Sequence, residues 1–196
     1  MTARSPLIIG IGGTTGGGSS TEAALRIALA AAEARGARTL LFGGEALAGL
    51  PHYNPKSAMR TPGEAALVAA ARAASGLILA SPGYHGNVSG VVKNALDLLE
   101  ETARDARPYL ADLPVGLIAT AYGWQATGST IAALRAIVHA FRGWPTPFAA
   151  AVNSRLCRFD EHGAAGDPEV ATQLALVGRQ VTDFALRAAM PLDIAS

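Results

Sequence analysis

Residues 7–21 read LIIGIGGTTGGGSST, and the organisation of the whole chain can be followed outward from them. The segment begins with an uninterrupted apolar run, Leu7–Ile11, which is typical of a strand buried on both faces of a parallel sheet. Five glycines and five hydroxyl residues then fill Gly12–Thr21, and helical apolar spacing follows. The segment therefore predicts a strand, a glycine-rich loop and a helix, which is the first part of a βαβ unit.

The same alternation recurs along the chain. Four further apolar runs without polar alternation are Thr39–Phe42, Leu77–Ala80, Val115–Ala119 and Phe148–Val152. Helical spacing is found at Leu25/Ala28/Leu29/Ala32, Val92/Ala95/Leu96/Leu99, Ile131/Leu134/Val138/Phe141 and Val170/Leu174/Val177/Val181/Phe184, and in the alanine-rich segment Pro62–Ala74. Five strands alternating with helices predict an α/β fold with a parallel sheet and right-handed crossovers. The two longer connections, 43–61 and 153–168, are interpreted as ordered loops, so residues 1–196 form one domain.

Composition excludes several classes of function. The formal net charge is +1 and no Lys/Arg run occurs, which argues against a nucleic-acid-binding protein. No apolar stretch reaches the ~20 residues of a membrane span, and no targeting signal is recognised. A single cysteine, Cys157, permits no internal disulfide, and we expect it to be buried and unreactive. The four histidines are scattered without ligand spacing. We expect a cytoplasmic protein without a metal site.

The glycine-rich loop has the composition of a phosphate-binding loop. Glycines allow backbone N–H groups to approach a ligand, hydroxyls add donors, and the helix that follows adds a partial positive charge. Ser19 stands where a P-loop has its lysine, and Thr15 stands where a dinucleotide loop has its third glycine. A mononucleotide such as flavin mononucleotide (FMN) fits better, held by Thr14, Thr15, Ser19, Ser20 and Thr21. The alternative is an ordinary helix start, in which Ser19 and Glu22 form a capping box.

A second loop carries a family resemblance. Residues 81–97 read SPGYHGNVSGVVKNALD, and they resemble the pattern P-x-Y-x-x-x-x-x-G-x-x-K-N-x-x-D of the NADPH-dependent FMN reductase family. The positions in register are Pro82, Tyr84, Gly90, Lys93, Asn94 and Asp97. The first loop also resembles that of the family, with one departure: Gly16 stands where the family has an arginine. This departure leaves the choice between NADPH and NADH open.

The resemblance implies a flavodoxin-like three-layer sandwich with a five-stranded parallel sheet of order 2-1-3-4-5. It implies FMN at the carboxyl ends of the strands, beside the switch point between the first and third. The residues expected to contact the flavin ring are Pro82, Gly83, Tyr84, His85, Gly86, Asn87, Ala121, Tyr122, Gly123 and Trp124. No general acid or base is nominated, because hydride transfer to a flavin depends on stacking and orientation.

Several side chains in these loops have two interpretations. For His85 we favour a role in positioning flavin or closing a turn over acid–base chemistry. Tyr84 either contacts flavin or packs as an ordinary aromatic residue, and Trp124, expected in a loop, either lies near the ring or packs in the core. Lys93 and Asp97 are one helical turn apart, and we interpret them as a solvated or subunit-facing pair.

Three functions remain open from the sequence. The first is an NAD(P)H-dependent reductase of free FMN that supplies reduced flavin to a monooxygenase. The second keeps FMN bound and reduces a small-molecule acceptor such as a quinone, an azo compound or chromate. The third is an electron carrier or a flavin-binding protein without turnover, although a carrier usually has the acidic surface that this chain lacks. The resemblance also implies a homodimer or homotetramer.

Overall fold

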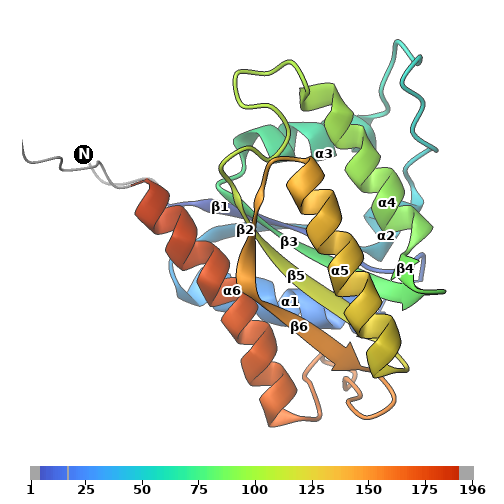
Figure 1. Ribbon diagram of the computed structural model, residues 1–196, viewed down its shortest axis with the longest axis vertical. Coiled ribbons are helices and arrows are strands. Elements are labelled where there is room, and N and C mark those ends of the chain that lie inside the picture. Colours follow the sequence, from blue (N-terminus) through green and yellow to red (C-terminus); the bar gives the residue numbers. More distant parts are fainter. Residues whose placement is uncertain (1–4, 17, 190–196) are drawn as a thin grey trace, which may run out of the picture.

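The computed structural model describes residues 5–16 and 18–189, in which helices and strands alternate (Figure 1). The strands are β1 (Leu7–Gly12), β2 (Arg38–Phe42), β3 (Gly76–Tyr84), β4 (Asn87–Val88), β5 (Pro114–Ala121) and β6 (Trp144–Asn153). The helices are α1 (Ser20–Ala34), α2 (Gly44–Ala48), α3 (Pro62–Ala73), α4 (Gly90–Asp97), α5 (Trp124–Ala140) and α6 (Pro168–Ala188), with a 3₁₀ helix, η1, at Leu98–Thr102. None of the helices in these ranges is long and apolar enough to cross a bilayer.

The sheet confirms the predicted topology. Five parallel strands lie in the order β2-β1-β3-β5-β6, which is the flavodoxin-like order 2-1-3-4-5. The short strand β4, which the sequence did not predict, pairs antiparallel with the end of β3. Helices α1 and α6 cover one face of the sheet, and α3, α4 and α5 cover the other (Figure 1). The carboxyl ends of the five strands therefore share one edge of the molecule.

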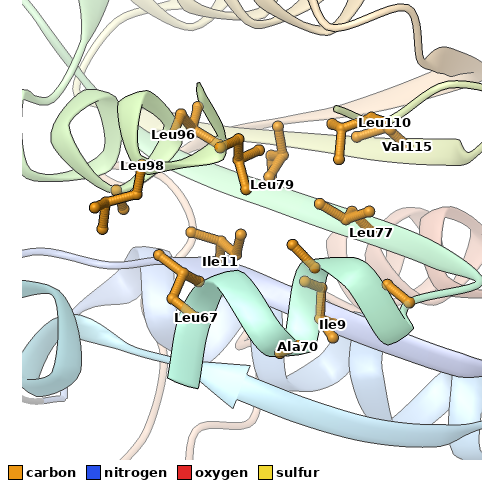
Figure 2. Close-up of a cluster of buried hydrophobic side chains, with 14 of the residues drawn as sticks. Ile9, Ile11, Leu67, Ala70, Leu77, Leu79, Leu96, Leu98, Leu110 and Val115 are labelled. Carbon is orange, nitrogen blue, oxygen red and sulfur yellow. The ribbon is translucent and has the colours of Figure 1, made fainter. Parts of the chain in front are cut away.

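The central strands are apolar because both of their faces are covered. Along β1, Ile9 and Ile11 pack with α3 and α4, whereas Ile8 packs with α1 and α6. Figure 2 shows the first of these clusters, where Ile9 and Ile11 lie among side chains of β3 and α3. The edge strand β2 differs from the expectation of burial on both faces. Its Leu40 is 44% exposed, because β2 has a neighbouring strand on one side only.

Two details of the helices correct the sequence-based expectations. Phe184 was placed on the buried stripe of α6, but it is 41% exposed. The buried stripe continues from Val181 to Ala185 instead. Because an α-helix has about 3.6 residues per turn, a residue four positions along lies closer to the same face than a residue three positions along. The connection 43–61 was expected to be a loop and contains the short helix α2. The rest of this connection is anchored by Asn94, whose side chain accepts a hydrogen bond from Tyr53 N (2.8 Å) and donates one to Pro51 O (2.9 Å).

Two interpretations that favoured ordinary structural roles are confirmed. The Lys93 ammonium lies 2.6 Å from the Asp97 carboxylate, and both side chains are exposed, as expected of a solvated or subunit-facing ion pair. Cys157 is 3% exposed and belongs to the core between α1 and α6.

Helix α3 begins with a complete capping box. The Thr61 hydroxyl accepts from Glu64 N (3.3 Å), and the Glu64 carboxylate accepts from Thr61 N (2.7 Å). Glu64 is 2% exposed and also contacts the Arg60 guanidinium at 3.4 Å. The hydrogen bond from the Thr61 backbone lowers the pKa of Glu64; burial opposes this effect but does not cancel it.

Acidification should therefore destabilise the protein in part through Glu64. Because its pKa in the folded state lies below the ordinary value of 4.5, the stability that it contributes is present above that pH and is lost as the pH falls through the folded pKa. Urea unfolding should be measured from neutral to acidic pH. We expect Glu64→Gln to have a lower free energy of unfolding than the wild type at neutral pH, and to lose less of it as the pH falls. The control is Glu161→Gln, since the Glu161 side chain is 86% exposed. Identical acid sensitivity in wild type and Glu64→Gln would contradict this account.

Candidate functional site

A cavity of about 1140 Å³ opens at the carboxyl ends of β1, β3, β5 and β6. Ligand sites of open α/β sheets lie at this edge, beside the point where the strand order reverses. The lining residues are Thr14, Ser19, Ser20, Thr21, Pro82, Gly83, Tyr84, Thr120, Ala121, Tyr122, Gly123, Ala126, Ser154, Arg155, Arg158 and Phe159. Ten of the fifteen site residues predicted from the sequence line this cavity, and they come from three separate loops. These ten are Thr14, Ser19, Ser20, Thr21, Pro82, Gly83, Tyr84, Ala121, Tyr122 and Gly123.

The first loop leads directly into the start of α1. Ser19 is the N-cap residue, and its hydroxyl accepts from Glu22 N at 3.2 Å. Ser19 and Ser20 are half-buried and line the cavity, as does Thr14, whose hydroxyl donates to Gly16 O at 3.2 Å. The positive end of a 15-residue helix and two serine hydroxyls thus meet at one wall of the cavity.

Two threonines of this loop are placed differently. Thr15 is exposed and lies outside the cavity lining, so its hydroxyl faces solvent in this conformation. Thr21 borders the cavity but is 2% exposed, and its hydroxyl lies 2.5 Å from the Thr120 hydroxyl. This buried hydrogen bond joins the first turn of α1 to the end of β5. A structural role thus accounts for Thr21 without a ligand.

Only half of the predicted capping box forms at α1. The Glu22 carboxylate accepts from Gly44 N (2.8 Å) and from the Arg26 guanidinium (2.6 Å) instead of from the N-cap backbone. Burial acts to raise the pKa of Glu22, but the Gly44 N–H and Arg26 together outweigh it and lower the pKa. Glu22 therefore ties the first residue of α2 to the base of the glycine-rich loop. The approach is close, since a Cβ at Gly44 would lie 1.9 Å from Thr14 O.

The second loop is a β-hairpin between β3 and β4. Its two turn residues, His85 and Gly86, have φ angles of 50° and 85°, as a two-residue type I′ turn requires. His85, Gly86 and Asn87 are exposed and do not line the cavity, whereas Pro82, Gly83 and Tyr84 do. The interpretation of His85 as a turn residue is therefore the one that the structure favours.

The third loop, after β5, is shorter than expected. Ala121 ends β5, and Tyr122 and Gly123 form the connection. Trp124 is the first residue of α5 rather than a loop residue; it is 58% exposed and does not line the cavity. The helix begins there because Gly123 takes the N-cap position in an extended conformation. Tyr122 is 76% exposed and Tyr84 53% exposed, so two aromatic rings stand at the cavity, Tyr84 from the end of β3 and Tyr122 from the loop after β5.

The sequence did not predict the part of the lining that follows β6. Ser154, Arg155, Arg158 and Phe159 come from this connection, and Thr120 and Ala126 complete the lining from β5 and α5. The signal that could have identified the two arginines is their position, because they directly follow a strand whose carboxyl end reaches the same sheet edge. They are the charged members of the described lining, which includes no carboxylate. Within the described ranges, no three His, Cys, Asp or Glu side chains gather as a metal site would.

Residues 6–155 match the family described as NADPH-dependent FMN reductase. The chain belongs to this family. The match includes the glycine-rich loop, the β3–β4 hairpin and the loop after β5. Three of the segments that contribute to the cavity lining therefore lie within the matched residues. Members are flavodoxin-like NAD(P)H-dependent oxidoreductases, in agreement with the sheet order.

Individual relatives are more distant. An FMN-dependent NADPH-azoreductase of Staphylococcus aureus (strain USA300) is 34% identical over 116 residues, which is 58% of this chain and 58% of the azoreductase. Among solved structures, an NADH:FMN oxidoreductase in its apo form has a TM-score of 0.71 at 22% identity, covering 97% of this chain and 93% of that one. The flavoenzyme NAD(P)H:(acceptor) oxidoreductase FerB from Paracoccus denitrificans has a TM-score of 0.69 at 18% identity, covering 93% and 98%. These two likenesses concern the fold.

Proposed function

We propose that the protein is an NAD(P)H-dependent FMN reductase that holds FMN in the cavity at the carboxyl edge of the sheet. One observation carries the proposal: the cavity joins the hydroxyl-bearing start of α1 to the β3–β4 hairpin and the loop after β5. A phosphate fits the first of these walls, because backbone N–H groups and serine hydroxyls gather there at the positive end of a helix. A flat ring fits between the other two.

The residues present suit FMN in size and in chemistry. The volume of about 1140 Å³ slightly exceeds the roughly 300–1,000 Å³ of most small-molecule sites, and such sites combine apolar walls with a few polar groups. Pro82, Gly83, Ala121 and Ala126 provide apolar or backbone surface, and the hydroxyls and arginines provide the polar groups. No carboxylate of the described lining opposes an anionic ligand.

Bound FMN would supply the redox chemistry, since it accepts a hydride from a reduced nicotinamide and passes the electrons to an acceptor. The chain contributes binding and orientation. No histidine, aspartate or glutamate is found among the described lining residues, and the role that we assign to the lining side chains is to orient the two reactants. Tyr84 and Tyr122 stand where they can limit the access of solvent and bound molecules to a ring in the cavity.

The acceptor distinguishes two versions of this function. In the first, FMN is a substrate that leaves in reduced form for a flavin-dependent monooxygenase. In the second, FMN stays bound and a small molecule such as a quinone, an azo compound or chromate is reduced; the similarity to an FMN-dependent NADPH-azoreductase favours an azo compound. Both versions use the same cavity, and both agree with the homodimer or homotetramer that the family resemblance implies.

The proposal is tested with the purified protein under anaerobic conditions. We expect FMN to bind with quenching of its fluorescence, and we expect NADPH or NADH to bleach the visible absorbance of the bound flavin. Steady-state rates with free FMN, an azo dye and a quinone then separate the two versions. Binding without bleaching by either nicotinamide would indicate a flavin-binding protein without turnover. The absence of both binding and bleaching would contradict the proposal.

A further inference from the structure

We propose that Arg155 and Arg158, in the connection between β6 and α6, bind the phosphate of FMN and supply the positive charge that the glycine-rich loop lacks. The inference rests on the proposed function and extends it, because it assigns a role to residues outside the three loops discussed above. The phosphate is the relevant part of the ligand, since arginine binds phosphate through two parallel, charge-assisted hydrogen bonds.

The first argument is the missing charge. Residues 12–21 contain no lysine or arginine, so a phosphate at this loop would meet only glycine N–H groups, hydroxyls and the helix dipole. A phosphate monoester carries about −1.5 to −2 charges near neutral pH. Arg155 and Arg158 line the same cavity as Ser19 and Ser20. They are therefore the cations of the described lining that can neutralise a phosphate there.

The second argument is the way in which this connection is held in place. Ser154 N donates to Ala121 O (2.9 Å), which fixes the start of the connection to the end of β5. Cys157 is buried in the core beside α1, and Phe159 packs against the same cluster. Further along, a Cβ at Gly163 would lie 3.9 Å from the Ala23 Cβ, in the first turn of α1. The two arginines thus belong to a segment that is packed against the helix start to which the phosphate is assigned.

The third argument is that the guanidinium groups are not engaged elsewhere. Across the residues that the structure describes, no hydrogen bond, ion pair or aromatic contact is made by either side chain. Other arginines are committed: Arg35 pairs with Asp183, Arg72 pairs with Asp105, and Arg107 donates to Ala71 O and Ala74 O. An anchored loop that presents two uncommitted arginines to a cavity is a suitable site for an anion.

The experiment compares FMN with riboflavin, which lacks the phosphate. Arg155→Ala, Arg158→Ala and the double variant are titrated with each flavin by fluorescence quenching, at low and at high salt. The control is Arg104→Ala, an exposed arginine in the segment before β5, at the opposite edge of the sheet. We expect FMN affinity to fall about tenfold to a hundredfold for each cavity arginine, as for loss of a charged hydrogen bond. Riboflavin affinity should stay within about twofold of the wild type, and the salt dependence of FMN binding should decrease.

Other outcomes would overturn the inference in ways that can be told apart. If the variants lose affinity for both flavins equally, the arginines maintain the shape of the cavity and do not bind the phosphate. If FMN affinity is unchanged but the KM for NADPH rises, the phosphates of the nicotinamide nucleotide are the ligand instead. If the wild type binds FMN and all variants bind it equally well, the inference fails while the proposed function stands. If the wild type does not bind FMN, the proposed function fails as well.

Discussion

Replacing Ser19 with aspartate should weaken FMN binding by at least about a hundredfold and leave the fold intact. Aspartate is as good an N-cap as serine, and its carboxylate can accept the hydrogen bond from Glu22 N. The same carboxylate would face the phosphate across the wall of the cavity that Ser19 lines. Two unit charges about 4 Å apart repel by about 4 kcal/mol at an effective dielectric constant of about 20, and about 1.4 kcal/mol corresponds to a tenfold change in affinity.

The matched control is Ser19→Asn. Asparagine caps helices as well as aspartate does and has nearly the same shape, but it carries no charge. We expect this variant to lose much less FMN affinity than Ser19→Asp, and both variants to unfold near the wild-type urea concentration. Fluorescence titration measures the affinities, and circular dichroism follows the unfolding. Equal affinity of Ser19→Asp and Ser19→Asn for FMN would show that no phosphate lies at this helix start.

Replacing Gly178 with leucine should cost at least about 3 kcal/mol of unfolding free energy. Gly178 lies on α6 where this helix crosses α1, and a Cβ there would lie 2.0 Å from the Ala28 carbonyl oxygen and 3.2 Å from Ala32 N. These are backbone atoms of α1, which cannot move aside as a flexible side chain would. Overpacking of ordinary core positions costs about 1–3 kcal/mol, and here the two helices must separate. Urea unfolding followed by circular dichroism measures the change.

Gly128→Leu provides the matched control for Gly178→Leu. Gly128 also lies inside a long helix, α5, but no atom would come within 4 Å of a Cβ at this position. Because glycine is roughly 1 kcal/mol less favourable than alanine in a helix, and leucine is close to alanine, this variant should be slightly more stable than the wild type. A Gly178→Leu variant as stable as Gly128→Leu would contradict the close contact between α1 and α6.

The sequence predicted the sheet well where burial alone decides the pattern. The apolar runs 7–11, 77–80 and 115–119 all fall within strands, because β1, β3 and β5 are covered on both faces. The prediction was less accurate at the margins of the fold. Leu40 and Phe184 are partly exposed, since β2 is an edge strand and the stripe of α6 turns toward Ala185. Whether a residue lies at an edge depends on neighbours that local periodicity does not reveal.

The candidate site was predicted in the same uneven way. Loops with a distinctive composition, such as 12–21 and 81–87, were found because glycines, hydroxyls and a family pattern mark them. His85 and Asn87 were included with them, but the positive φ angles of the hairpin turn carry these residues away from the cavity. Arg155 and Arg158 were missed because nothing local marks an isolated arginine as a ligand. Only the tertiary fold packs the connection after β6 against the first turn of α1.

The partner of Glu22 was equally hidden from the sequence. The pattern Ser19–Glu22 predicts a reciprocal capping box, but the carboxylate bonds Gly44 N, which is 22 positions along the chain. A tertiary hydrogen bond has replaced a local one, and the glycine-rich loop gains support from the start of α2. Capping patterns therefore locate the helix start here without indicating how all of its groups are satisfied.

A crystal structure of the protein with FMN tests the central claim most directly. We predict phosphate density at the start of α1, within hydrogen-bonding distance of Ser19, Ser20 and the backbone N–H groups of the glycine-rich loop, with the ring between the β3–β4 hairpin and Tyr122. FMN bound in the reverse orientation, with its phosphate beside the hairpin, would contradict the assignment of the loop. Flavin bound at any other place on the molecule would contradict the account as a whole.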